Sequence, residues 1–116
     1  MYDRDRRSQR VTLPEPQQAR VGRQPAFVVD VSLGGFGVAQ QVDTTSAIGQ
    51  PRRVSFEWNG RNATFVCELR WLRSHQRLGS GSFTRSVYHA GYQVVHGTAE
   101  GYDILRDILR EYSARS

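Results

Sequence analysis

Residues 53–72 read RVSFEWNGRNATFVCELRWL, and this stretch contains the clearest hairpin of the chain. Apolar and polar side chains alternate on both sides of Asn59-Gly60, the dipeptide favoured in tight type I′ turns. In an extended strand, such alternation puts the apolar side chains on one face. The face expected in the core comprises Val54, Phe56, Trp58, Ala63, Phe65, Cys67, Leu69 and Trp71. We therefore expect two antiparallel strands here, with both tryptophans packed inside.

Alternation on the N-terminal side of this hairpin predicts further strands. In AFVVDVSL, residues 26–33, the two polar side chains of Asp30 and Ser32 are expected to face away from the core. The expected core positions of this strand are Phe27, Val29, Val31 and Leu33. The glycine-rich GGFG at 34–37 indicates a turn, and the strand after it alternates through Phe36, Val38, Gln40 and Val42. A weaker strand is indicated between Val11 and Arg23.

On the C-terminal side, residues 73–86 are rich in Ser, Gly and Arg and predict a long flexible hairpin connection. VYHAGYQVV at 87–95 predicts the last strand. The spacing then becomes helical, with Thr98 as the expected N-cap of a helix over 98–113. The apolar face of this helix comprises Ile104, Leu105, Ile108, Leu109 and Tyr112.

These elements predict an all-β fold with a C-terminal helix: a six-stranded antiparallel β-barrel closed or plugged by that helix. The chain of 116 residues suits one domain over 1–116. Within it we expect a flexible Arg-rich arm at 1–12, the barrel at 26–96 and the helix at 98–113. The lack of alternating strands and helices excludes doubly wound nucleotide-binding folds.

The composition points to a cytoplasmic protein with an anionic partner. The formal net charge of +5 favours such a partner. All 16 basic residues are arginine, which pairs bidentately with phosphate, but GC-rich codon usage is the preferred explanation of this bias. Cys67 is the single cysteine, so no internal disulfide can form, as is usual in a reducing compartment. No apolar run approaches the roughly 20 residues of a membrane helix, so we expect no membrane insertion.

Two polar elements form the candidate binding site. In RDRRSQRV, residues 4–11, Arg6 and Arg10 are four residues apart and can act together on one ligand. In DVSLGG, residues 30–35, Asp30 and Ser32 project together, and the following glycines allow a ligand to approach the backbone. Taken separately, the first element suits a solvated basic tail, and the second suits a turn in which Asp and Ser bond to the local backbone.

Together these elements resemble the RxxxR and [DN]xSxxG motifs of PilZ domains, the bacterial receptors for the second messenger cyclic di-GMP. The resemblance implies a six-stranded split barrel whose N-terminal arm wraps over the nucleotide. It also implies that the arginines contact phosphates and guanine faces, that Asp30 contacts a guanine edge, and that Ser32 and the glycines lie near the nucleotide. The ligand-binding residues expected on this basis are Arg6, Arg7, Arg10, Asp30, Ser32, Gly34 and Gly35.

We expect the chain to act as a small adaptor that binds cyclic di-GMP and relays the signal to a downstream protein. One alternative is a PilZ-like interaction module that binds no nucleotide. Asp5 beside Arg6 favours this alternative, because its carboxylate would repel the phosphates of a nucleotide. A second alternative is a basic barrel for single-stranded nucleic acid, which would need exposed aromatic side chains on one face. The motifs argue against nucleic acid as a partner.

No pattern indicates catalysis, a cofactor or a metal. There is no nucleophile elbow, phosphate-binding loop or dinucleotide fingerprint, so we expect the protein not to be an enzyme. The spacings of the three histidines and Cys67 match no zinc pattern. The acidic residues of the helix alternate with arginines, which predicts surface ion pairs among Asp103, Arg106, Asp107, Arg110 and Glu111.

Overall fold

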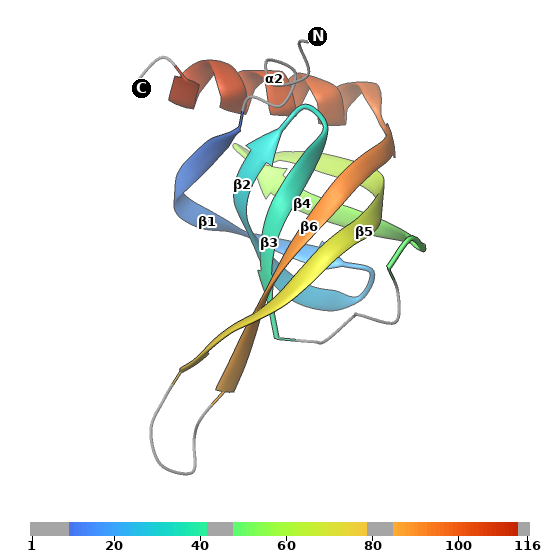
Figure 1. Ribbon diagram of the computed structural model, residues 1–116. Helices are drawn as coiled ribbons and strands as arrows, with labels where there is room; N and C mark the ends of the chain where they lie inside the picture. The colour runs from blue at the N-terminus through green and yellow to red at the C-terminus, as the bar shows by residue number, and fades with distance from the viewer. Residues whose placement is uncertain (1–9, 42–47, 79–84, 114–116) are drawn as a thin grey trace, which may run out of the picture.

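The computed structural model of the protein describes residues 10–41, 48–78 and 85–113, with side chains over 10–41, 48–73 and 87–112. The elements are β1 (Val11–Val21), β2 (Gln24–Ser32), β3 (Gly35–Gln40), β4 (Pro51–Trp58), β5 (Arg61–Leu78), β6 (Arg85–Gly97) and α2 (Ala99–Ser113). The strands close into an antiparallel barrel in the order β1-β2-β3-β6-β5-β4 (Figure 1). The predicted six-stranded barrel with a C-terminal helix is therefore confirmed.

The central hairpin forms as the sequence predicts. β4 and β5 pair without a register shift from Trp58↔Arg61 to Pro51↔Glu68. The two turn residues, Asn59 and Gly60, have φ values of 52° and 77°, as a type I′ turn requires. This local turn fixes the register, and the register in turn places the apolar face of both strands inside the barrel.

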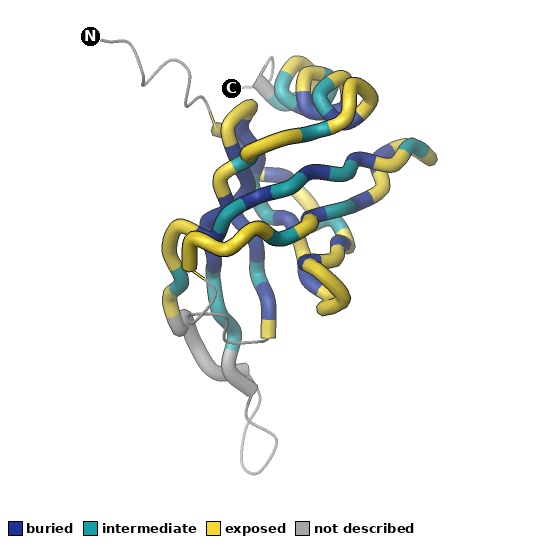
Figure 2. The backbone as a smooth tube through the Cα atoms, turned by 90° about the vertical axis from the view of Figure 1, so that its right-hand side faces the viewer, coloured by how far each residue is buried: buried dark blue, intermediate teal, exposed yellow. Residues whose placement is uncertain are grey.

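The helix covers one end of the barrel and buries its apolar face there (Figure 1). Ile104, Leu105 and Ile108 are fully buried, and exposed residues lie between the buried ones along the helix (Figure 2). Thr98 is the N-cap: its Oγ1 accepts a hydrogen bond of 2.9 Å from the backbone N–H of Gly101. The end of the chain therefore closes the core.

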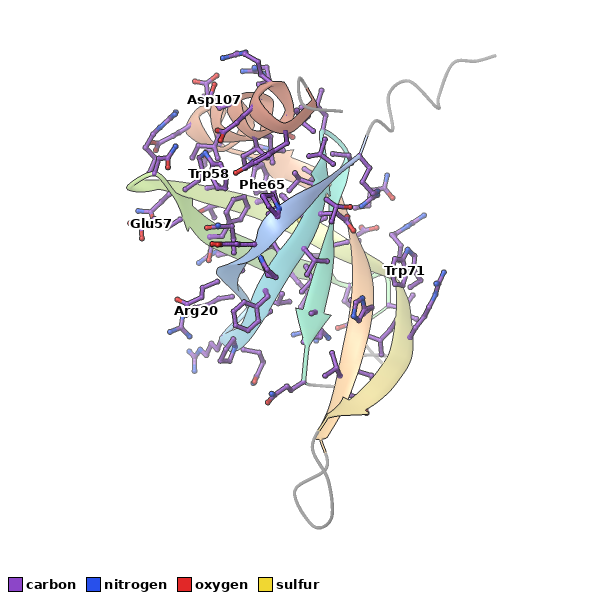
Figure 3. All side chains as sticks on the ribbon, turned by 90° about the vertical axis from the view of Figure 1, so that its left-hand side faces the viewer. Arg20, Glu57, Trp58, Phe65, Trp71 and Asp107 are labelled. Carbon is purple, nitrogen blue, oxygen red and sulfur yellow. The ribbon has the colours of Figure 1, made fainter. Side chains whose placement is uncertain are left out.

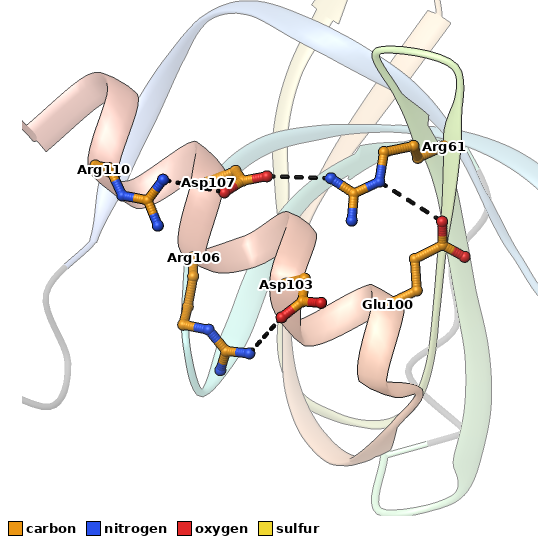
Figure 4. Close-up of polar contacts among 6 residues, drawn as sticks. All are labelled: Arg61, Glu100, Asp103, Arg106, Asp107 and Arg110. Carbon is orange, nitrogen blue, oxygen red and sulfur yellow. Dashed lines mark hydrogen bonds and ion pairs between the residues drawn. The ribbon is translucent and has the colours of Figure 1, made fainter.

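Ion pairs hold the outer face of α2, as the alternating charges predict. Asp103 pairs with Arg106 at 2.6 Å, and Asp107 pairs with Arg110 at 3.3 Å. Arg61 of β5 also reaches Asp107 at 3.1 Å (Figure 4). The described residues contain no group of three or more His, Cys, Asp or Glu side chains that could hold a metal ion.

The barrel begins earlier than residue 26. β1 is a long strand from Val11, although Pro14 and Pro16 interrupt its hydrogen bonding. The register with β2 shifts between Thr12 and Gln17, so the two prolines lie where the ladder is irregular. The first residues of the strand, including Val11, belong to the core rather than to an arm.

The connection expected over 73–86 is mostly strand. β5 continues to Leu78 and β6 starts at Arg85, and these two residues pair. The two strands therefore extend beyond the barrel as a ribbon (Figure 1). No helix of the described residues is both long and apolar enough to cross a membrane.

The predicted core face of β2 is right at Val31, which is fully buried, and wrong at Phe27 and Leu33. Phe27 and Leu33 are each 45% exposed, whereas Ala26, Val28 and Val31 are buried. The register with β3 shifts between Val28 and Asp30, which inserts one extra residue and reverses the alternation after it. Ser32 is also buried, at 3% exposure, although the alternation would place it outside; its hydroxyl bonds to the backbone of Gly34 and Gly35.

The core position predicted for Trp71 is also wrong. Trp58 is in the core at 7% exposure, but Trp71 is 41% exposed. Between Leu69 and Trp71 the register with β6 shifts by one residue, so Arg70 is the extra residue of a bulge. The alternation reverses there, and Leu72 packs against the core in place of the indole.

The buried thiol of Cys67 leads to a first prediction. Desolvation raises its pKa from 9.0 to about 12. At pH values between the two pKa values, the unfolded chain loses the thiol proton and the folded chain keeps it. The free energy of unfolding should therefore fall as pH rises through this range. The decrease from this group is at most about 1.4 kcal/mol per pH unit. Denaturant unfolding at about pH 8 and about pH 10.5 should show a smaller decrease in Cys67→Ala; equal decreases would contradict the prediction.

Candidate functional site

A row of four cross-strand partners crosses the outer surface of the barrel. Asp30 on β2 pairs with Gly37 on β3, Gly37 pairs with Gly91 on β6, and Gly91 pairs with Trp71 on β5. The two glycines in the middle leave the surface of β3 and β6 uncovered by side chains of their own. The row is therefore a glycine floor on which the carboxylate of Asp30 lies over Gly37 and the indole of Trp71 lies over Gly91.

Contacts show that the floor needs both glycines. A Cβ on Gly37 would lie 2.5 Å from each carboxylate oxygen of Asp30. A Cβ on Gly91 would lie 2.3 Å from the indole of Trp71. A side chain at position 37 would displace the Asp30 carboxylate, and a side chain at position 91 would displace the Trp71 indole. The sequence places Gly37 in a turn and gives Gly91 no role, since only the strand register reveals their neighbours.

Arg10 and Asp30, two of the predicted ligand-binding residues, form an ion pair. The Nη1 of Arg10 donates to Oδ1 of Asp30. The ladder brings them together, because Thr12 pairs with Asp30 and Val11 pairs with Val31. The two side chains are 49% and 24% exposed, so solvent reaches both. Arg10 directly precedes β1 and therefore lies beside the carboxylate of Asp30, which the motifs assign to the same site.

Ser32 shapes the turn between β2 and β3. Its Oγ accepts from the N–H of Gly34 at 3.2 Å and donates to the carbonyl of Gly35 at 3.4 Å. Gly35 packs closely on β6, since a Cβ there would lie 2.2 Å from the carbonyl oxygen of Tyr92. Gly34 is exposed, with nothing near its Cβ position. The turn role considered for Asp30 and Ser32 is thus present for Ser32, whereas Asp30 pairs with Arg10.

A groove of about 350 Å³ connects these features. It contains four of the predicted residues, Arg10, Ser32, Gly34 and Gly35, together with residues that the sequence did not indicate. Its lining comprises Arg10, Ser32, Gly34, Gly35, Phe36, Arg70, Trp71, Gly91, Tyr92 and Gln93. Arg6 and Arg7, also predicted to bind ligand, lie outside the described residues.

The β5 edge of the groove combines positive charge with an aromatic ring. Arg70 forms an exposed ion pair with Glu68 at 3.4 Å. The guanidinium of Arg73 lies 4.7 Å from the centroid of the Trp71 ring. Trp71 projects from the barrel near this edge (Figure 3). The groove therefore has Arg70 and the Trp71 ring on one side and Arg10 on the other, and Arg10 is paired with Asp30 just outside the lining. This arrangement suits a flat polar ring that carries phosphate.

Comparison with known proteins shows the fold of the chain. A scan of the sequence against family models finds no match, and a search of curated proteins finds no relative. Among solved structures, the protein is similar to the PilZ domain of YcgR from Escherichia coli, determined with c-di-GMP. The TM-score is 0.71 at 14% sequence identity, and the match covers 94% of this chain and 92% of that one. The chain therefore has the PilZ fold that its motifs predict.

Proposed function

We propose that this protein is a cytoplasmic bacterial receptor for cyclic di-GMP that acts by binding alone and relays the signal to a downstream protein. The main support is that Arg10, Asp30 and Trp71 lie along one glycine floor on the barrel surface. The solved PilZ domain with this fold contains c-di-GMP, and the RxxxR and DxSxxG motifs are complete in this chain.

Each group has a defined part in the proposed complex. The Asp30 carboxylate accepts hydrogen bonds from the N1 and N2 edge of a guanine, and Arg10 contacts a phosphate. Arg6 and Arg7, in the preceding arm, supply further positive charge. The exposed backbone at Gly34 admits the ligand, and Ser32 keeps the turn in shape. No covalent bond changes in this process.

Trp71 extends the set of residues expected from the motifs. Its exposed indole is large enough to stack on a purine, and stacking contributes about 1–3 kcal/mol per base. The guanidinium of Arg73 lies over the Trp71 ring. A stacked base would therefore either displace this guanidinium or bind to the opposite face of the ring.

Calorimetric titration with cyclic di-GMP tests the function. We expect saturable binding by the wild type and about tenfold weaker binding by Trp71→Ala, as loss of one stacked base predicts. In a Trp58→Phe variant the remaining indole is Trp71, and its fluorescence should change during the titration. A wild-type protein that gives no binding heat would refute the proposal, and unchanged affinity in Trp71→Ala would remove the stacking role.

A further inference from the structure

Four arginines lie around the β1–β2 turn, away from the groove described above. Gly22 at this turn donates its N–H to the carbonyl of Arg53 at 2.7 Å, which places β4 beside the turn. Arg20 donates to the carbonyl of Arg23 at 3.4 Å, and a guanidinium nitrogen of Arg52 lies 4.0 Å from the Cβ position of Gly22. We call this set the arginine cluster: Arg20, Arg23, Arg52 and Arg53.

The cluster has no acidic partner among the residues that the structure describes. In the described part of the chain, the ion pairs of arginine are formed by five residues outside the cluster: Arg10, Arg61, Arg70, Arg106 and Arg110. Four like charges around one turn repel one another, so the fold gains no stability from their proximity. Such a concentration of charge attracts an anionic group from outside the chain.

A groove larger than the first begins at this cluster. Its volume is about 590 Å³, within the range of about 300–1,000 Å³ typical of ligand sites. It crosses the outer faces of β2, β1, β4 and β5, and we call it the second groove. Its lining comprises Gln18, Ala19, Arg20, Pro25, Ala26, Phe27, Ser55, Phe56, Glu57, Asn62 and Thr64. Arg20 and Glu57 lie on one side of the barrel and Trp71 on the other (Figure 3).

The charges of the second groove differ between its two edges. Arg53 and Glu57 project from the same outer face of β4, and four residues of strand separate them by about 13 Å. The edge at the cluster is therefore positive, and the edge at Glu57 is negative. An RNA strand or an anionic membrane would place negative charge on both edges and would be repelled at Glu57.

The middle of the second groove offers apolar and hydrogen-bonding surface. Phe27 is 45% exposed there, and Pro25 and Phe27 also line an adjoining apolar hollow of about 350 Å³ with Ala39 and Val87. Ser55, Asn62 and Thr64 can both donate and accept hydrogen bonds. A polypeptide supplies all the matching chemistry: backbone amides and carbonyls, an apolar side chain, and charges of either sign.

We propose that the second groove binds an extended segment of a partner protein, with acidic side chains on the arginine cluster, an apolar side chain on Phe27 and an uncharged or basic end beside Glu57. This inference rests on the adaptor role proposed above, for which it supplies the docking surface. The partner is recognised by this pattern of charge along its chain.

Selection from a displayed library of random peptides of about ten residues, against the protein without nucleotide, tests the proposal. We expect enriched peptides with Asp or Glu grouped toward one end and an apolar residue next to them. Arg20→Ala/Arg53→Ala should weaken their binding about tenfold or more, since charge-assisted contacts are lost. The matched control Arg106→Ala/Arg110→Ala also removes two exposed arginines and should change affinity less than about twofold. Equal losses, or enriched peptides without grouped acidic residues, would overturn the proposal.

Further arms separate the competing occupants. An oligothymidylate or vesicles of phosphatidylglycerol that bind more tightly than the peptides, and depend on Arg20 and Arg53, would assign the surface to nucleic acid or membrane instead. In Glu57→Gln, replacing the uncharged or basic end of a selected peptide by acidic residues should no longer weaken binding. If the acidic replacement weakens binding to Glu57→Gln as much as it weakens binding to the wild type, the proposed orientation of the peptide in the groove is wrong.

The nucleotide site is measured in parallel. Arg20→Ala/Arg53→Ala should bind cyclic di-GMP with wild-type affinity, because the two grooves share no lining residue. The peptide selection uses protein without nucleotide. A loss of peptide binding and a loss of cyclic di-GMP binding can therefore be measured independently.

Discussion

Replacing Arg10 by alanine is expected to weaken cyclic di-GMP binding by about 10- to 100-fold. A hydrogen bond to a charged group contributes about 1.5–3 kcal/mol, and each 1.4 kcal/mol corresponds to about tenfold in affinity. The change also leaves the Asp30 carboxylate without its ion-pair partner, beside a ligand that carries two phosphates. Calorimetry on the purified variant measures this loss.

Asp30→Ala should weaken binding to a similar extent, but the two losses should not add. Because Arg10 and Asp30 contact each other, the double variant is expected to lose less than the sum of the single losses. Asp30→Asn, introduced into Arg10→Ala, should recover part of the affinity, since it removes an uncompensated negative charge next to the phosphates.

The control for this series is Arg61→Ala. Arg61 is also an ion-paired arginine, but its partners Glu100 and Asp107 lie on or near the helix, and it does not line the first groove (Figure 4). Its variant should bind the nucleotide as the wild type does. If Arg10→Ala, Asp30→Ala and the arm variant Arg6→Ala all keep wild-type affinity, the proposed site is refuted.

The largest effect on stability is expected from Phe65→Ala, at about 3–5 kcal/mol. Phe65 is 1% exposed and joins the barrel to the helix. Its ring lies 5.0 Å from that of Phe36 in the barrel and 5.7 Å from that of Tyr102 in α2, measured between centroids. Truncation would leave a cavity between two elements that cannot both move inward to fill it.

Equilibrium unfolding in denaturant, followed by circular dichroism, measures this loss. The control is Phe27→Ala, which removes the same atoms from a ring that is 45% exposed and should cost only about 1–1.5 kcal/mol. The account of the core would be contradicted if both variants unfolded at the same denaturant concentration.

Much of the architecture could be predicted because it depends on local pattern. Strict alternation from Val54 to Leu69, interrupted by Asn59-Gly60, defines a hairpin whose register is fixed by its own turn. The change from a period of two to helical spacing near Thr98 marks the closing helix in the same way.

The candidate site could be predicted only in part. Arg10, Asp30 and the Ser32 turn carry recognisable motifs; Arg10 and Ser32 line one groove, and Asp30 pairs with Arg10 beside it. Nothing in the sequence near Trp71 distinguishes it from the core residues before it. Its exposure results from the bulge at Arg70, which is defined against β6 rather than within β5.

The sequence by itself therefore determined the strand and helix pattern, the central hairpin and the polar motifs, since each depends on residues close together in the chain. Only the tertiary structure decided which side chains face outward after Val29 and Arg70, and that Asp30 and Trp71 lie over a floor made by Gly37 and Gly91. The physical reason is that a bulge and a cross-strand row are properties of pairing between distant strands. One shifted residue moves every later side chain to the opposite face.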